Sequence, residues 1–254
     1  MASEIGMADD VLDLTGQARQ LGLAGDFGTA HQLIDRAMRL AGGDSTGRAA
    51  CAIERGRLYN SAGQRDLARP LFDEAWRLAR EAGAHVLAAD AAHMLAIVGT
   101  LDDAVEWTAI GLAYVGEHPQ AEPWRGPLLN NLGWSYVDAG RFEDALPVFE
   151  QAVEARRGQA RELRIARYAV VRTLRALRRI EDARRLAEEV ASVAEADGDQ
   201  APYVHEELAE CHAALGDVER ARSSARRALA VLENDPAFVG QQPHRLARLR
   251  DLAG

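Results

Sequence analysis

The chain has 254 residues, of which 48% are hydrophobic, so it can bury a core and is not a disordered segment. Its formal net charge is −9 and its 30 basic residues are all arginine, which excludes strong non-specific attraction of the whole molecule to nucleic acid or anionic lipid. No apolar run approaches the roughly 18 residues that a membrane-spanning helix needs.

Six pairs of helices are predicted in chain order. They fall near residues 8–23/27–41, 46–62/65–82, 84–98/101–114, 122–139/142–158, 159–177/180–197 and 200–215/218–233. Residues 116–127 contain three prolines and predict a connector that acts as a local joint, and residues 234–243 predict a second connector. A short basic helix over His244–Leu252 is expected to cap the last apolar face, within one domain over residues 1–254.

A pattern of small and large residues recurs in these pairs. The fourth pair carries it most clearly, at Leu132, Gly133, Tyr136, Gly140, Ala145, Phe149 and Ala152, and the second repeats it at Gly56, Tyr59, Gly63, Ala68, Phe72 and Ala75. The turn between the two helices falls at positions 25, 63, 99, 140, 178 and 216. Glycine stands at each turn except the fifth, where Arg178 predicts a less sharp or strained turn, since glycine takes a left-handed conformation at little cost.

The pattern resembles the tetratricopeptide repeat family over roughly residues 8–233. The steps between turns are longer than the common one of about 34 residues, as in long-repeat variants of bacterial regulators and sensors. The resemblance implies an all-α fold, a right-handed superhelical solenoid of six helical hairpins with a C-terminal capping helix. It also implies that the first helix of each hairpin lines the concave groove.

That arrangement gives the candidate ligand-binding residues of the groove: Arg57, Asp90, His93, Asn130, Asn131, Trp134, Arg164, Tyr168, Arg172, Arg175, Tyr203, Glu206 and Glu210. Arg19, Glu54, Asn60 and Glu207 are expected on the same surface. The grouping of Asn130, Asn131 and Trp134 has two interpretations. They hold a ligand, or the asparagines satisfy helix ends while the tryptophan packs between repeats.

Residues 156–185 hold eleven arginines against three acidic residues. Arginine binds carboxylates and phosphates through two parallel hydrogen bonds, so this segment predicts a partner with acidic groups. In the alternative interpretation, Arg172 and Arg175 face Glu206 and Glu210 across the interface between repeats.

Catalysis is the rival hypothesis. Asp90 and His93 are three residues apart on one helix face, and His205 lies near Glu206 and Glu210 in sequence, so a carboxylate and an imidazole are available for acid–base or metal chemistry. The sequence has no HExxH, GxxxxGK[ST], GxGxxG or GxSxG motif, so we predict no catalytic residue, metal site or cofactor. Cys51 and Cys211 are expected to be buried small hydrophobic residues.

The sequence therefore predicts an adaptor that binds a peptide or protein segment in its groove, with neither nucleic acid nor membrane as a partner. The alternatives are an enzyme or small-molecule sensor, with Asp90, His93, Asn131, Arg164, Tyr203 and Glu206 around a closed pocket, and a scaffold that self-associates through its ends. The first residues, MASEIGMADD, lack the basic lead and apolar run of a secretory signal, and the two cysteines form no disulfide framework. We expect a cytoplasmic protein.

Overall fold

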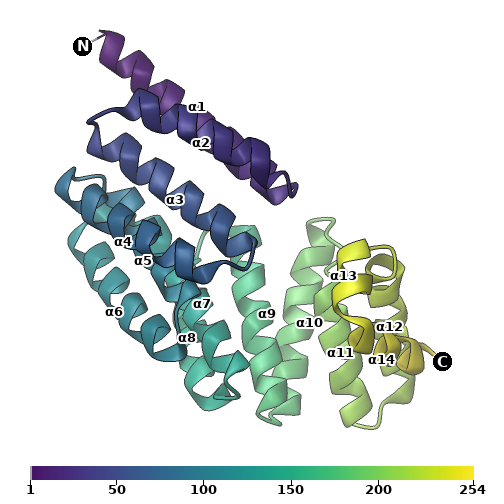
Figure 1. Ribbon diagram of the computed structural model, residues 1–254. Helices are drawn as coiled ribbons and strands as arrows, with labels where there is room; N and C mark the ends of the chain where they lie inside the picture. Colours follow the sequence, from purple (N-terminus) through teal and green to yellow (C-terminus); the bar gives the residue numbers. More distant parts are fainter. Residues whose placement is uncertain (1) are drawn as a thin grey trace. The chain divides into compact units, whose positions relative to one another are not determined.

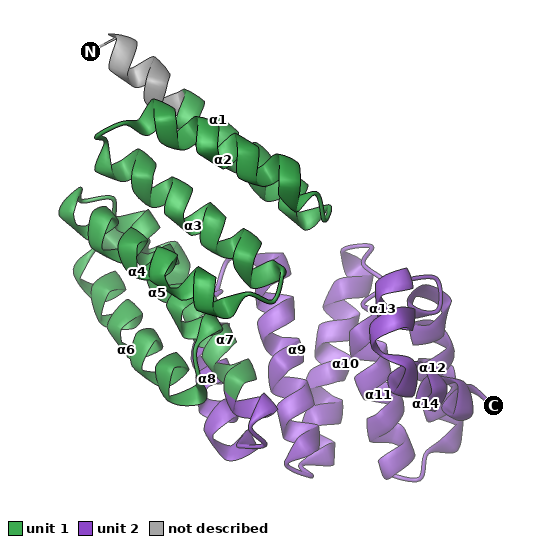
Figure 2. Ribbon diagram, viewed as in Figure 1, with its two compact units in different colours: residues 1–135 green, residues 136–254 purple. Residues whose placement is uncertain are grey.

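The computed structural model describes the backbone of residues 2–254 and the side chains of residues 10–254, and every regular element in that range is helical (Figure 1). The all-α helical-repeat fold expected from the sequence is confirmed. The chain divides into two compact units, Met1–Ser135 and Tyr136–Gly254 (Figure 2). The boundary lies inside the helix Arg125–Asp138, after the predicted joint at residues 116–127.

Unit 1 consists of helical hairpins followed by a short 3-10 helix and the start of α7. Its elements are α1 (Ala2–Leu23), α2 (Phe27–Ala41), α3 (Ser45–Ser61), α4 (Arg65–Glu81), α5 (His85–Val98), α6 (Leu101–Glu117), η1 (Pro119–Trp124) and α7 (Arg125–Asp138). From α1 to α6 each helix packs against the next one along the chain, and η1 packs against α5 and α6. Helix α1 also packs against α3, as α3 does against α5.

Unit 2 begins with the end of α7 and continues the same alternation. Its helices are α8 (Phe142–Ala155), α9 (Ala160–Ala176), α10 (Ile180–Ala196), α11 (Pro202–Ala214), α12 (Val218–Leu232), α13 (Pro236–Gln241) and α14 (Pro243–Ala253). The predicted cap is confirmed as α14, which packs against α12 through the buried side chains of Leu246 and Leu249.

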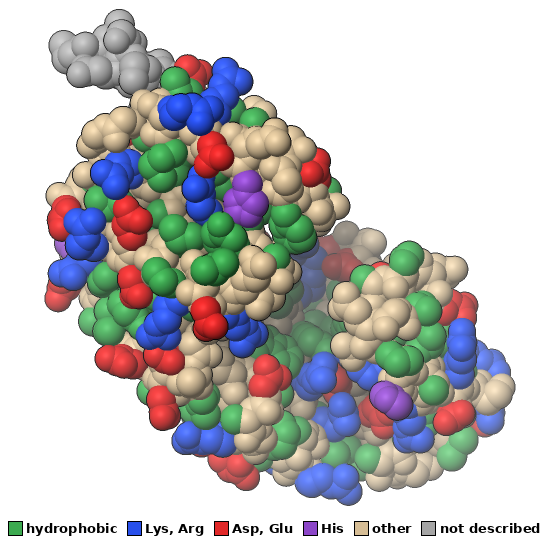
Figure 3. Space-filling view, in the orientation of Figure 1, with side chains coloured by type: hydrophobic (Ala, Val, Ile, Leu, Met, Phe, Trp, Pro, Cys, Tyr) green, Lys and Arg blue, Asp and Glu red, His purple; other side chains and the backbone are tan. Residues whose placement is uncertain are grey.

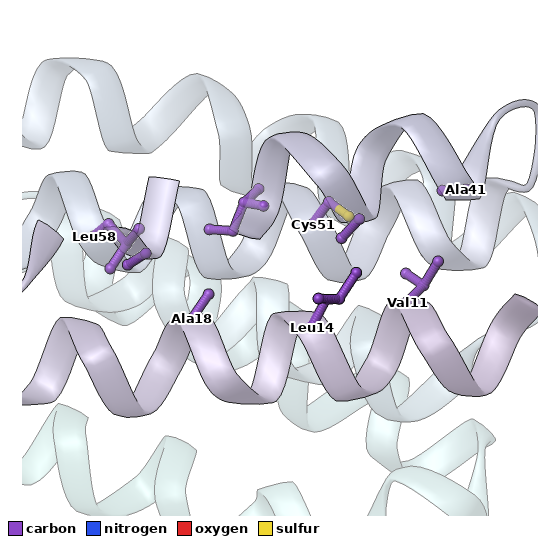
Figure 4. Close-up of a cluster of buried hydrophobic side chains, with 9 residues drawn as sticks. Val11, Leu14, Ala18, Ala41, Cys51 and Leu58 are labelled. Atoms are coloured by element: carbon purple, nitrogen blue, oxygen red, sulfur yellow. The ribbon is translucent and has the colours of Figure 1, made fainter. Parts of the chain in front are cut away.

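The core follows the repeated pattern of small and large residues. In the first hairpin and α3, a buried cluster includes Val11, Ala18 and Cys51 (Figure 4). In the second hairpin, a Cβ built on Gly56 would lie only 2.5 Å from Cε1 of the fully buried Phe72, so the approach of the two helices requires glycine. Small residues thus let the helices cross closely, and large ones fill the space between hairpins.

The turn of the fifth hairpin keeps the conformation of the glycine turns although it has no glycine. Arg178 has φ of +61°, close to the values of the glycines at the first, second, fourth and sixth turns, which are +85° at Gly25, +76° at Gly63, +72° at Gly140 and +80° at Gly216. The turn is therefore as sharp as the glycine turns, and Arg178 adopts a left-handed conformation that costs an L-residue more than it costs glycine.

The third turn differs from the expectation for glycine. Gly99 is extended, with φ of −89°, and the next residue, Thr100, caps the start of α6 through a capping box with Asp103. A Cβ on Gly99 would lie 2.3 Å from Cβ of Asp103, so glycine is needed here for close approach and not for a left-handed turn.

Two segments expected to be connectors are partly helical. Helix α6 continues to Glu117 and is followed by η1, and α13 forms within residues 234–243. In both short helices proline stands in the first turn, where its fixed φ suits a helix and its missing N–H is not needed. Asp235 caps α13 by accepting hydrogen bonds from the backbone N–H groups of Ala237 and Phe238.

Candidate ligand-binding face

Several residues predicted to bind a ligand form bonds between the first helices of successive hairpins or with α14, which follows the last hairpin. We call the side formed by α1, α3, α5 and α7 the A-face of unit 1, and the side formed by α9, α11 and α14 the A-face of unit 2. On each face, polar side chains join one first helix to the next.

On the A-face of unit 1, a row of ion pairs runs from α1 to α5. Glu54 of α3 lies 3.6 Å from Arg19 of α1 and also pairs with Arg57, which in turn pairs with Asp90 of α5. The row has two positive and two negative groups, so it is internally compensated. Glu54 and Asp90 are 9% and 6% exposed, which shows that the row is a largely buried structural network.

The row continues to α7 through a hydrogen bond between two uncharged side chains. Asn131 of α7 donates through Nδ2 to Nε2 of His93 in α5 at 2.6 Å, and the ring of Trp124 lies 5.0 Å from the imidazole. Trp124, in η1, was missed by the sequence analysis because its segment was expected to be a plain connector. Asn131 and His93 are therefore hydrogen-bonded to each other.

Burial shifts the pKa values of Asp90 and His93 in opposite senses. It raises the pKa of Asp90 to about 6, against the influence of Arg57, and it lowers the pKa of His93 to about 3 with help from the charges of Arg57 and Arg19. An imidazole with so low a pKa is neutral at physiological pH and is too weak a base for general-base catalysis.

The six residues of the enzyme or sensor hypothesis divide between the two units. In unit 1, Asp90 is bonded to Arg57 while His93 is bonded to Asn131. In unit 2, Arg164 lies 2.6 Å from Asp197 and 3.1 Å from Asp199, near the start of α11. Tyr203 and Glu206 both contact Arg245 of α14. Within either unit, these residues are engaged with other partners and do not form one catalytic set.

On the A-face of unit 2, three glutamates of α11 are paired with arginines of the two neighbouring helices. Arg175 of α9 lies 2.5 Å from Glu207, whose side chain is 1% exposed. Glu206 pairs with Arg245 of α14 at 2.6 Å, and Glu210 pairs with Arg248 of α14 at 3.0 Å.

The predicted pairing of α9 with α11 is thus present but involves another glutamate. In one of the two interpretations of the arginine-rich segment, Arg172 and Arg175 face Glu206 and Glu210, whereas the observed partner of Arg175 is Glu207. Arg172 donates to the hydroxyl of Tyr168 at 3.3 Å. The difference arises because successive residues of a helix point about 100° apart, so a shift of one position selects a different neighbour.

A polar and aromatic patch of the A-face of unit 2 stays open to solvent. A pocket of about 320 Å³ lies between α9 and α11, and its walls include Arg161, Ile165, Tyr168 and Tyr203. Ile165 is 50% exposed and Tyr203 is 39% exposed, both large for apolar or aromatic side chains. We call Arg161, Ile165, Tyr168 and Tyr203 the open patch.

Six of the eleven arginines in the arginine-rich segment, residues 156–185, pair with carboxylates of the chain itself. Besides Arg164 and Arg175, these arginines pair with carboxylates: Arg157 with Glu154, Arg179 and Arg185 with Asp182, and Arg184 with Glu181 and Glu188. Acidic and basic side chains are accordingly interspersed on the faces that Figure 3 shows. Among the described residues, Arg161 has no carboxylate within ion-pair distance. The other two charged residues of the pocket wall, Arg164 and Asp199, pair with each other, so the open patch keeps the positive charge of Arg161.

The two cysteines are buried, as expected, and burial raises the pKa of Cys51 to about 11 and that of Cys211 to about 12, so neither is a reactive thiolate. Within the described part of the chain, no three histidine, cysteine or acidic residues are grouped as metal ligands. None of the described helices combines the length and apolar character needed to cross a bilayer.

Sequence comparison identifies the repeats. Models of the tetratricopeptide repeat match residues 128–157 and residues 168–237, and the same helical-hairpin fold extends over the remaining described residues. The chain therefore carries tetratricopeptide repeats over these matched residues. No curated protein matches its sequence.

Several solved structures share the fold at low sequence identity. The apo form of RapI is 12% identical with a TM-score of 0.75, covering 96% of this chain and 68% of its own. BtubC from P. vanneervenii is 21% identical with a TM-score of 0.68, covering 79% of this chain and 87% of its own. NprR in complex with its cognate peptide NprX is 14% identical with a TM-score of 0.57, covering 95% of this chain and 72% of its own.

Proposed function

We propose that the protein is an interaction module that binds a peptide or protein segment with acidic groups on the A-face of unit 2. The observation that carries this proposal is the open patch, where the exposed Ile165 and Tyr203 stand beside the positive charge of Arg161. Exposed aromatic and arginine side chains are the residue types that contribute most to binding in protein interfaces.

Charge supports an acidic partner. The glutamates of α11 are paired with arginines of the chain itself, so they do not repel an acidic ligand. Arg161 can then form an ion pair with an acidic group of the ligand. The similarity in fold to NprR, whose structure holds a bound peptide, is consistent with a polypeptide ligand. Asn130 and Trp134 of α7 are partly exposed, and they stay predicted ligand contacts of the A-face of unit 1.

The test compares the wild-type chain with Tyr203→Ala in binding to a synthetic peptide library with fixed glutamates among varied apolar residues. We expect Tyr203→Ala to weaken binding of the selected peptides about tenfold or more, because loss of an aromatic anchor typically costs more than about 1 kcal/mol. Leu67→Ala is the matched control, since Leu67 is 53% exposed on α4 in unit 1 and should leave binding unchanged. Equal binding by wild type and Tyr203→Ala would refute the proposal.

A further inference from the structure

The side chain of Arg245 lies on the A-face of unit 2 among residues that suit an arginine. Its Nε and Nη2 donate to the two carboxylate oxygens of Glu206 at 2.7 and 2.6 Å. Its guanidinium carbon lies 5.7 Å from the ring centre of Tyr203 and 5.2 Å from that of Phe238, and Nη2 lies 3.5 Å from the hydroxyl of Tyr168. A carboxylate that accepts two parallel hydrogen bonds, with aromatic rings beside it, is the usual environment for recognising a guanidinium group.

The residues around Arg245 and the open patch have two members in common. Tyr168 and Tyr203 line the 320 Å³ pocket of the open patch beside Arg161, and the same two side chains contact Arg245. Glu206 is only 6% exposed, so its charge is poorly screened by water and is neutralised mainly by Arg245. Without that arginine, a negative charge would remain next to the two tyrosines.

We propose that Arg245 determines the specificity of the ligand site in unit 2. By filling the subsite of Glu206, Tyr203 and Phe238, it makes the neighbouring patch select acidic segments, and without it the same subsite selects arginine-bearing segments. This inference rests on the proposed function, and it assigns to the C-terminal helix α14 a part in choosing the partner.

The attachment of α14 does not depend on Arg245 alone. Leu246 and Leu249 are 5% and 1% exposed and pack in the core formed with α12, so they anchor the helix. Arg248 offers a matched control, because it lies one turn further along α14 and also pairs with a glutamate of α11, Glu210, at 3.0 Å. No aromatic contact of Arg248 is present among the described residues.

The experiment uses two synthetic peptide libraries with the same varied apolar positions, one with fixed glutamates and one with fixed arginines. Full-length wild type, Arg245→Ala, Arg245→Gln and Arg248→Ala are each immobilised, and the ratio of bound glutamate peptides to arginine peptides is measured. We expect wild type and Arg248→Ala to favour the glutamate library. We expect both Arg245 variants to lower that ratio by about a hundredfold or more. Loss of the Arg245 charge should weaken binding of glutamate peptides about tenfold and strengthen binding of arginine peptides about tenfold.

The double variant Arg245→Gln/Glu206→Gln separates specificity from simple loss of structure. It removes both charges, so it should lose the preference for arginine and recover preference for glutamate. If wild type binds neither library, the proposed function fails. If wild type favours glutamate and the folded Arg245 variants keep the same ratio, the function stands and the role of Arg245 is refuted. Far-ultraviolet circular dichroism establishes that each variant is folded. If Arg245→Ala is not folded, Arg245→Gln serves in its place, because glutamine retains most of the aliphatic stem.

Discussion

Arg178 is the residue at which local backbone preference and the repeat architecture conflict. Its φ of +61° lies in the left-handed region, which costs an L-residue about 1–2 kcal/mol and costs glycine very little. We therefore expect Arg178→Gly to stabilise the protein by about 0.5–1 kcal/mol, after allowing for the greater freedom of glycine in the unfolded chain. The melting temperature measured by calorimetry should rise by about 1–4 °C.

Arg178→Ala separates the backbone effect from loss of the side chain, because alanine removes the guanidinium but keeps the Cβ that causes the strain. Only the glycine variant should be stabilised. A glycine variant that melts at or below the wild-type temperature would show that the conformation of Arg178 carries no strain.

His93 predicts a dependence of stability on pH. Its pKa is about 3 in the folded chain and near 6.5 when unfolded, so folding favours the neutral ring. This contribution is complete above pH 6.5 and is lost as the pH falls toward 3. Between about pH 7 and pH 5, the unfolding free energy of wild type should fall by about 1–2 kcal/mol more than that of His93→Gln.

The comparison with His93→Gln is needed because Asp90 acts in the opposite sense. The pKa of Asp90 is raised to about 6, so its contribution to stability is present at low pH and is lost as the pH rises from about 4 to 6. Urea unfolding of both proteins at each pH gives the difference in which other groups cancel. If the difference in unfolding free energy between the two proteins does not change with pH, folding does not lower the pKa of His93.

At the scale of helices, the sequence was sufficient to predict the hairpins but not the short elements between them. The hairpins are specified repeatedly, by glycine turns and by residues such as Gly56 and Phe72 that must meet for two helices to cross. By contrast, η1 and α13 are each six residues long. They are too short for an apolar period to be visible, and their prolines suggest connectors although proline also suits a first helical turn.

The site was predictable as a face but not as a set of contacts. Residues such as Arg57, Asp90, Arg175 and Glu206 do join neighbouring first helices, as their positions in the repeat indicate. Sequence period places a residue on a face to within about one position, whereas the choice between Glu206 and Glu207 as the partner of Arg175 depends on the rotation of one helix against another. The part played by Arg245 was not predictable, because α14 was expected to provide only an apolar cap.

At the scale of the whole molecule, stability should be local, because hairpins pack mainly against their neighbours along the chain. Phe72 in unit 1 and Phe149 in unit 2 are both fully buried, so they offer matched core sites. Replacing a buried phenylalanine by alanine typically costs about 3–5 kcal/mol through lost burial and a cavity. The damage should therefore concentrate in the unit that carries the substitution.

Hydrogen exchange followed by mass spectrometry tests this expectation. Phe72→Ala should speed amide exchange in α3–α5 on the order of a hundredfold and change exchange in α10–α12 far less, because about 3 kcal/mol corresponds to that factor. Phe149→Ala should show the reverse, with the greatest change in α8 and α9. Equal acceleration in both units by either variant would show that the chain unfolds as one cooperative body, in which case the energy of each hairpin is shared along all of its neighbours.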